Sequence, residues 1–285
     1  MNAPTFDRSA DNVGNVLLLE HVNLRVPDPM LAHTFYVSAL GLTRDPYVDF
    51  GVFGISVTWV NAGPTQFHLI KGDAQRLRGT IEFVVPDLAA LATRLTRMHS
   101  LFTGTQMSCI DDGDHLTITC PWGNRIRCAE SKPDDRLVLG IRALDLDVPV
   151  GTAAGIAHFY RSALGAPATA ANGRAEVRIG QSQRLCFSET TAHIPDYDGH
   201  HIAIYIADFS GPHAWLNERG HISEDSDAHQ YRFQALVDPQ SGAVLSELEH
   251  EVRSLCHPMW GRSLVNRNAA EQVPNFRADR EAFRP

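Results

Sequence analysis

The chain has 285 residues, of which 44% are hydrophobic, and a formal net charge of −8. This length suits two domains with real apolar cores, and the acidic balance argues against nucleic acid or an anionic membrane as a partner. No apolar run approaches the roughly 20 residues that span a bilayer, and the start lacks a signal-peptide pattern. The five cysteines are odd in number and show no C-x-x-C spacing, which is typical of reduced thiols in a cytoplasmic protein.

The sequence contains an internal duplication. FYVSALG at residues 35–41 returns as FYRSALG at residues 159–165. Upstream, HVNLRVPD at 21–28 corresponds to ALDLDVPV at 143–150, and downstream QFHLI corresponds to QRLCF. The chain is therefore built from a repeated unit, and its function is sought where the copies differ.

Hydrophobic periodicity predicts that the first copy contains two rounds of one strand–helix–strands unit. The elements expected in the first round are a strand at 17–28, a helix at 29–40 closed by Gly41, and strands near 47–53, 55–60 and 66–70. Those of the second round are a strand at 80–87, a helix at 88–98, and strands near 103–110, 116–119 and 125–129.

The second copy repeats this order. The elements expected in its third round are a strand at 139–148, a helix at 152–164, and strands at 176–179 and 184–188. Those of the fourth round are a strand at 201–208, a helix near 212–218, and strands near 231–237 and 243–250. The charged, proline-containing segment 131–136 is the expected linker.

We therefore expect an α+β fold of four βαβββ modules in tandem, paired into two half-barrel domains. The N-terminal pair of modules is expected over residues 16–130 and the C-terminal pair over residues 137–253. Residues 254–285 show no clear periodicity and are expected to form an irregular extension over the surface.

The pattern resembles the vicinal oxygen chelate superfamily, which includes glyoxalases, extradiol dioxygenases and bleomycin-resistance proteins. The resemblance covers roughly residues 17–253 and rests on H-x-x-x-R-V-x-D at 21–28, the FYxSALG helix, HIAIYIAD at 201–208 and D-P-x-x-G at 238–242. Such motifs identify the fold well and the reaction poorly. The resemblance implies that pairs of modules form a U-shaped cup around a metal, with ligands on the first and last strands of the modules.

Strand alternation places candidate ligands on open faces of sheet. Val22, Leu24 and Val26 form one apolar face of the first strand, so the residues between them face the opposite way. By the same argument, the side chains expected toward the cups are His21, Asn23, Arg25, Gln66, His68, His201, Ala203, Tyr205, Leu245, Glu247, Glu249 and Glu251. Neutral imidazole together with carboxylate oxygen is the ligand chemistry of a divalent transition metal.

Comparison of the modules indicates which cup holds the metal. The residues aligned with His21, His68 and His201 in the partner modules are Ala143, Leu185 and Thr80. A cup closed by the first module against the fourth would collect the three histidines and one glutamate. The other cup would hold Thr80, Arg127, Ala143 and Leu185 and bind no metal.

The expected metal ligands are His21, His201 and Glu249. Glu249 is chosen because ELEHEVRS resembles the closing strand of related sequences, although an ion pair with Arg253 would also explain this acid. Glu247 is the fallback ligand. The residues expected to act in catalysis are Glu247, as a proton acceptor, His68 and Tyr231, and those expected to bind substrate are Asn23, Tyr205, His229 and Arg232. His68 could also serve only as pocket lining.

A second pairing of modules stays open at this point. If the first and second modules closed together, His21, His68 and Glu130 would form a set of two histidines and one carboxylate. Glu130 and Glu249 each stand seven residues after a turn glycine, Gly123 and Gly242 respectively. This pairing would leave His201 without a role.

Three functions fit these residues. Two histidines and one carboxylate leave adjacent metal positions open, the arrangement of non-haem Fe(II) oxygenases, and a dioxygenase-type oxidoreductase with Fe(II) is the favoured interpretation. A glyoxalase-type lyase or isomerase with Zn, Ni or Mn as Lewis acid is the first alternative. A metal-free small-molecule-binding protein is the second.

The partner expected in each case is a small molecule, and a homodimer is an open option. The tail holds Trp260, Arg262 and Arg267, which are suited to closing over an acidic or aromatic substrate. A strap that covers a sheet edge or a dimer contact would explain the same residues.

Overall fold

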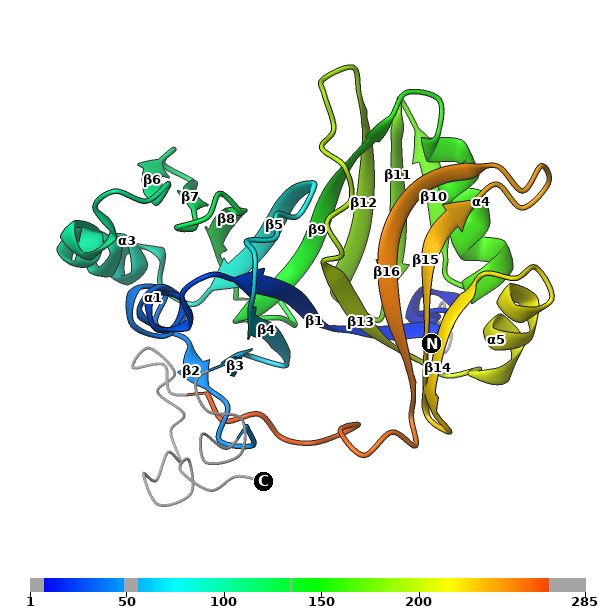
Figure 1. Ribbon diagram of the computed structural model, residues 1–285, viewed down its shortest axis with the longest axis horizontal. Coiled ribbons are helices and arrows are strands. Elements are labelled where there is room, and N and C mark those ends of the chain that lie inside the picture. The colour runs from blue at the N-terminus through cyan, green and yellow to red at the C-terminus, as the bar shows by residue number, and fades with distance from the viewer. Residues whose placement is uncertain (1–7, 49–55, 134, 267–285) are drawn as a thin grey trace, which may run out of the picture.

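The computed structural model describes residues 8–48, 56–133 and 135–266 (Figure 1). In these residues the strands form two mixed sheets of eight strands each, sheet A and sheet B. The strands of sheet A, from edge to edge, are β14 (Ile222–Asp227), β15 (Gln230–Val237), β16 (Val244–Ser254), β13 (His201–Ile206), β1 (Val16–Val26), β4 (Thr65–Lys71), β3 (Val57–Ala62) and β2 (Thr43–Arg44). Those of sheet B are β10 (Ala168–Ala171), β11 (Arg174–Ile179), β12 (Gln183–Thr190), β9 (Gly140–Pro149), β5 (Gly79–Val85), β8 (Arg125–Glu130), β7 (His115–Thr119) and β6 (Ser108–Asp111).

Each sheet joins one module of the first copy to one of the second. β1 of the first module pairs antiparallel with β13 of the fourth, and β5 of the second pairs antiparallel with β9 of the third. The expected α+β fold of tandem βαβββ modules in two half-barrels is confirmed. The alternative closure of the first module with the second is wrong, because Glu130 lies in sheet B, where its carboxylate accepts a hydrogen bond from the N–H of Leu88. The domain boundaries at 16–130 and 137–253 stay a prediction.

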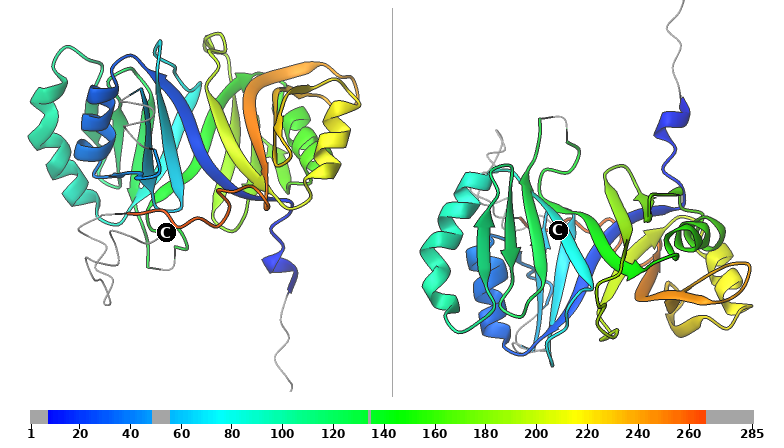
Figure 2. Two further views of the ribbon diagram at one scale, coloured as in Figure 1. Left: turned by 60° about the horizontal axis from the view of Figure 1, so that its bottom comes forward. Right: turned by 90° about the horizontal axis from the view of Figure 1, so that it is seen from above.

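The helices lie in two pairs at opposite ends of the molecule, outside the sheets (Figure 2). At one end lie α1 (Pro29–His33), which continues as the π-helix η2 (Thr34–Ala39), and α3 (Leu88–Met98). At the other end lie α4 (Ala153–Leu164) and α5 (Ser210–Asn217). Two short 3-10 helices, η1 (Arg8–Asp11) and η3 (His99–Phe102), are also present. The repeated Phe-Tyr pair joins each helix pair: Phe35 packs edge-on against Phe102 at 5.8 Å between ring centroids, and Phe159 against Trp215 at 5.9 Å. No helix in the described part of the chain has the length and apolar surface needed to cross a membrane.

Some elements differ from those expected. The helix expected over 29–40 changes from an α-helix to a π-helix after His33. There the N–H of Leu40 bonds to the carbonyl of Phe35, five residues back, at 2.9 Å. The strand expected over 47–53 falls mostly on residues outside the described ranges. The edge strands β10 and β14 were not expected, because their exposed small and acidic residues lack an apolar alternation.

β1 carries a bulge that the alternation rule does not predict. Leu19 lies opposite Ile204 and His21 opposite Ala203, so Glu20 is an extra residue on β1. A bulge re-aims side chains, and here Glu20 and His21 come to lie on the same side of the sheet. The same irregularity recurs in sheet B, where Arg142 is the extra residue of β9.

Hydrogen bonds beside these bulges tie the two sheets together. Gln183, at the start of β12 in sheet B, accepts from the N–H of Leu19 on β1 and donates to the carbonyls of Leu19 and Ile141. A similar bond runs in the opposite direction, from sheet B to sheet A. The hydroxyl of Thr65, at the start of β4, accepts from the N–H of Ile141 on β9. Gln183 and Thr65 are both buried, so these backbone groups depend on them for partners.

Gln183→Leu is expected to destabilise the fold by about 2–4 kcal/mol, because it leaves three buried backbone groups without a partner. Gln181→Leu is the matched control, since Gln181 is exposed and bonds only to the exposed Arg136 side chain. We expect it to change stability by less than about 0.5 kcal/mol. Urea unfolding of both variants measures the difference, and equal losses would contradict this role of Gln183.

Candidate metal centre

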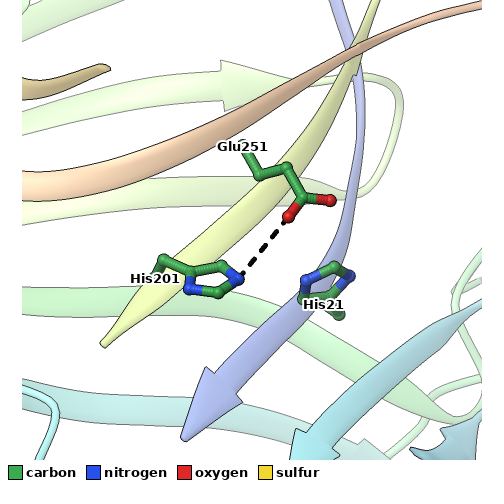
Figure 3. A group of neighbouring side chains, drawn as sticks. All are labelled: His21, His201 and Glu251. Atoms are coloured by element: carbon green, nitrogen blue, oxygen red, sulfur yellow. Dashed lines mark ion pairs between the residues drawn. The ribbon is translucent and has the colours of Figure 1, made fainter. Parts of the chain in front are cut away.

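Three side chains from neighbouring strands of sheet A converge on one point (Figure 3). His21 comes from β1, His201 from β13 and Glu251 from β16, and their potential ligand atoms lie within 4.8 Å of one another. His21 and Glu251 flank Ala203 across the sheet, and His201 stands two residues before Ala203 on the same strand. Ala203, which has the smallest side chain among them, therefore lies at the centre of the group.

His21 is buried and presents one free nitrogen. Its Nδ1 lies 3.0 Å from Glu20 Oε2, and its Nε2 has no hydrogen-bond partner among the described residues. Burial lowers the pKa of His21 well below its usual value, so the imidazole is neutral. With Nδ1–H donated to Glu20, the lone pair of Nε2 is available to a metal, as in carboxylate–histidine–metal arrangements.

His201 faces two carboxylates. Its Nε2 lies 3.6 Å from Glu251 Oε2, and its Nδ1 lies 3.6 Å from Glu249 Oε1. Burial lowers the pKa of His201 to about 3, with the nearby Arg232 and Arg253 acting in the same direction. This imidazole is also neutral near pH 7 and can act as a metal ligand.

The cluster around the histidines carries a charge that a cation would balance. Three carboxylates, those of Glu20, Glu249 and Glu251, contact two guanidiniums, those of Arg232 and Arg253. With all three carboxylates ionised, this group carries one negative charge in excess; burial raises the pKa of Glu20, and a bound cation would favour its ionised form. Two neutral imidazoles, one carboxylate and this excess charge together fit a divalent transition metal.

The carboxylate in the group is Glu251 and not Glu249, which we expected. Both glutamates lie on the cup face of β16, and Glu251 is the one that stands beside Ala203, across from His21. Glu249 lies opposite His201 and binds Arg232 at 2.5 Å. Glu247, the fallback, accepts a hydrogen bond from Gln234 Nε2 at 2.7 Å and lies outside the group.

His68 supports His21 and does not join the ligand group. Its ring is stacked on that of His21, with centroids 3.6 Å apart, and Trp59 stacks on its other side at 4.1 Å. His68 Nε2 lies 3.1 Å from Gln66 Oε1. The stack fixes the plane of the His21 ring.

Three of the expected substrate-binding residues lie close to the centre. Asn23 stands beside both His201 and His68 in the sheet, on the same face. The Tyr205 hydroxyl donates to Glu20 Oε1 at 3.3 Å, so Tyr205 lies behind Glu20. Arg232 binds Glu249 and Glu251.

Neither Tyr231 nor His229 stands on the cup face of a strand. The ring of Tyr231 packs against Phe209 and His213, each at 5.0 Å, on the side of sheet A that α5 covers. Adjacent strand residues face opposite ways, so Tyr231 cannot share the cup with Arg232. His229 lies in the turn between β14 and β15, where its carbonyl accepts from the N–H of Ser254.

The described part of the tail crosses from β16 to β3 and closes one end of the cup (Figures 1 and 2). Trp260 packs on Tyr205 at 4.8 Å, and Arg262 binds both oxygens of the buried Asp45, at 3.1 and 2.7 Å. Asn61 then donates to the carbonyl of Val265 at 3.0 Å. A cavity of about 320 Å³ lies between this strap, Tyr205 and Glu20. Arg267 falls outside the described ranges.

The second cup holds an ion pair in the equivalent place. Glu82 occupies the position of Ala203, and Arg127 that of Glu251, with Arg127 Nη1 3.8 Å from Glu82 Oε2. Ala143 takes the place of His21, as expected. The counterpart of His68 is Cys186, however, and not Leu185, whose side chain is fully buried in the core. No metal-type group was found there among the described residues.

Neither a family model nor a curated protein matches the sequence. A Bacillus subtilis protein provisionally assigned as a dioxygenase is 13% identical, with a TM-score of 0.56 over 84% of this chain and 86% of its own. Glyoxalase I from Zea mays is 14% identical, with a TM-score of 0.55 over 85% of this chain and 93% of its own. At these identities the likeness shows only that the chain shares the fold of these two proteins.

Ala203→Leu is expected to weaken metal binding at least about tenfold, because the added carbons fill the space above Ala203 and displace the ligand atoms. Ala203→Gly is the matched control and should bind as the unchanged protein does. Titration with Zn²⁺ against a chromophoric chelator measures both. Overpacking in the core costs about 1–3 kcal/mol, so unfolding in the presence of EDTA shows whether the Leu variant is folded. Unchanged affinity in a folded Leu variant would exclude this position for the ion.

Proposed function

We propose that the protein is a metal-dependent enzyme in which His21, His201 and Glu251 hold a divalent transition metal, with Fe(II) as the first candidate. Its reaction would be a dioxygenase-type oxidation of a small oxygen-bearing or aromatic substrate. The observation that supports this is the convergence of two neutral imidazoles and one carboxylate within 4.8 Å. Such a set occupies one face of the ion and leaves adjacent positions open, as in non-haem Fe(II) oxygenases.

The surroundings of the three residues support the same interpretation. His68 is bonded to Gln66 and stacked on His21, which argues against a third histidine ligand. Asn23 lies next to His201 on the cup face, and we expect it to hydrogen-bond the substrate. Fe(II) in this place would supply the activation of O2 and of a substrate that chelates it through two oxygens.

A glyoxalase-type isomerase or lyase is the second candidate. It is favoured by the likeness to glyoxalase I and by a carboxylate, that of Glu249, beside the ligand group. Such a reaction needs a proton acceptor next to a Lewis-acidic Zn, Ni or Mn ion. Glu249 lies 3.6 Å from His201 Nδ1, whereas Glu247, which we expected in this role, bonds to Gln234.

Metal analysis tests the proposal against a metal-free binding protein. Protein purified without chelators should contain one equivalent of Fe, Mn, Ni or Zn by elemental analysis. His21→Ala and Glu251→Gln should each lower metal affinity by more than about 100-fold. Loss of a residue that only hydrogen-bonds a metal ligand already lowers metal affinity about 10–100-fold. Glu249→Gln should lower the affinity less, by about tenfold, because Glu249 faces only the outer nitrogen of His201. Protein that has no affinity for any of these ions would favour the binding-protein alternative.

The reaction class is tested with the anaerobic Fe(II) protein. Addition of a catechol should give a new absorption band, and O2 should then be consumed with the catechol in equal amounts. Conversion of the thiol adduct of a 2-oxo aldehyde without O2 consumption would instead identify a glyoxalase-type enzyme. Glu251→Gln should abolish whichever activity is found, because a ligand is lost.

A further inference from the structure

More carboxylates surround the two histidines than the centre uses. Glu20 Oε2 lies 3.0 Å from His21 Nδ1, and Glu249 Oε1 lies 3.6 Å from His201 Nδ1. Of the three glutamates, only Glu251 belongs to the ligand group with His21 and His201. Three glutamates on one divalent ion would leave little room for a substrate, so something must keep two of them off it.

Two arginines divide these carboxylates. Arg253 binds Glu20 Oε2 through Nη1 and Glu251 Oε1 through Nη2, each at 2.5 Å. Arg232 binds Glu249 Oε1 through Nη1 at 2.5 Å and contacts Glu251 Oε2 through Nη2. Each guanidinium therefore spans the ligand glutamate and one outer glutamate. The rigid fork of arginine suits such a bridge, whereas a lysine ammonium is a single point charge.

We infer that Arg232 is a positioning residue that holds Glu249 out of the coordination sphere of the ion, and so keeps two adjacent positions open for a chelating substrate. The inference rests on the proposed metal-binding function. Glu249 and Glu251 sit at two ends of one guanidinium, so Glu249 is a neighbour of the ligand carboxylate and within a side-chain rotation of the ion. Bound to Arg232, it instead faces Nδ1 of His201 and orients that ring.

Electrostatics gives the expected direction of the change. Arg232 shares its positive charge between Glu249 and Glu251, and so weakens the attraction of the ion for the Glu249 carboxylate. Without the guanidinium, Glu249 is an unpaired, partly buried anion beside a divalent cation, and binding the ion is its best compensation. The site would then gain affinity for the metal and lose an open position.

Arg232 can be tested because it lies on β15 with a side chain that is 20% exposed, whereas the side chain of Arg253 is 8% exposed. The variants are Arg232→Met, which removes the charge, and the double variant Arg232→Met/Glu249→Gln, which removes both partners. Arg232→Lys serves if the Met variant does not fold, because it keeps the charge but loses the fork. The measurements are the Co²⁺ dissociation constant and the binding of acetohydroxamate, a bidentate oxygen chelator, to the Co²⁺ protein.

We expect Arg232→Met to bind Co²⁺ about tenfold more tightly or better and to bind acetohydroxamate about tenfold more weakly. The added Glu249→Gln change should reverse both effects, and Arg232→Lys should move both in the same directions by a smaller factor. Weaker or unchanged Co²⁺ binding by Arg232→Met, or no reversal by Glu249→Gln, would overturn the role of Arg232. Failure of the unchanged protein to bind Co²⁺ would overturn the proposed function itself, and this inference with it.

Discussion

At the centre of sheet A, β1 and β13 pair antiparallel in a register that sets His21 opposite Ala203 and Asn23 opposite His201. β16 continues this row from the other side of β13, where Glu251 lies beside Ala203. The candidate ligands thus come from three parts of the chain that meet only through strand pairing. A slip of one residue in either ladder would turn a whole row of side chains to the helix side. The chemistry of the cup depends on these two registers.

The two cups show how one backbone serves two purposes. Both central strand pairs keep the same bulge, with Glu20 as the extra residue in sheet A and Arg142 in sheet B. Glu82 fills the position that Ala203 leaves open, and Arg127 neutralises it. In sheet A the centre is formed by small and neutral groups, which suits the proposed ion, whereas in sheet B the charges of Glu82 and Arg127 compensate each other. A duplicated chain can keep one cup as a scaffold while the other holds the proposed metal centre.

Much of the fold could be predicted because it follows from local patterns. The repeat indicated the modules, and period-two alternation placed His21, Asn23, His201 and Ala203 on one face, as the structure has them. The comparison between modules also indicated that the first closes with the fourth, since ligand-type residues gather there.

The details of the site could not be predicted, because they depend on departures from regular strands. The bulge at Glu20 turns this residue toward His21, where alternation would place it on the opposite side. Glu251 is the converging carboxylate because it stands beside Ala203, across from His21, whereas Glu249, central in the sequence motif, is bound to Arg232. The roles of Arg232 and Arg253 arise from contacts between β1, β15 and β16, and no pattern within one strand reports such contacts.

Anomalous X-ray diffraction from crystals grown anaerobically with Fe(II) tests the central claim most directly. The account predicts one strong iron peak in the cup of sheet A, at roughly 2.0–2.2 Å from His21 Nε2, His201 Nε2 and a Glu251 oxygen. An iron peak at another place, or one bound through His68 or Glu249 in place of these groups, would contradict it.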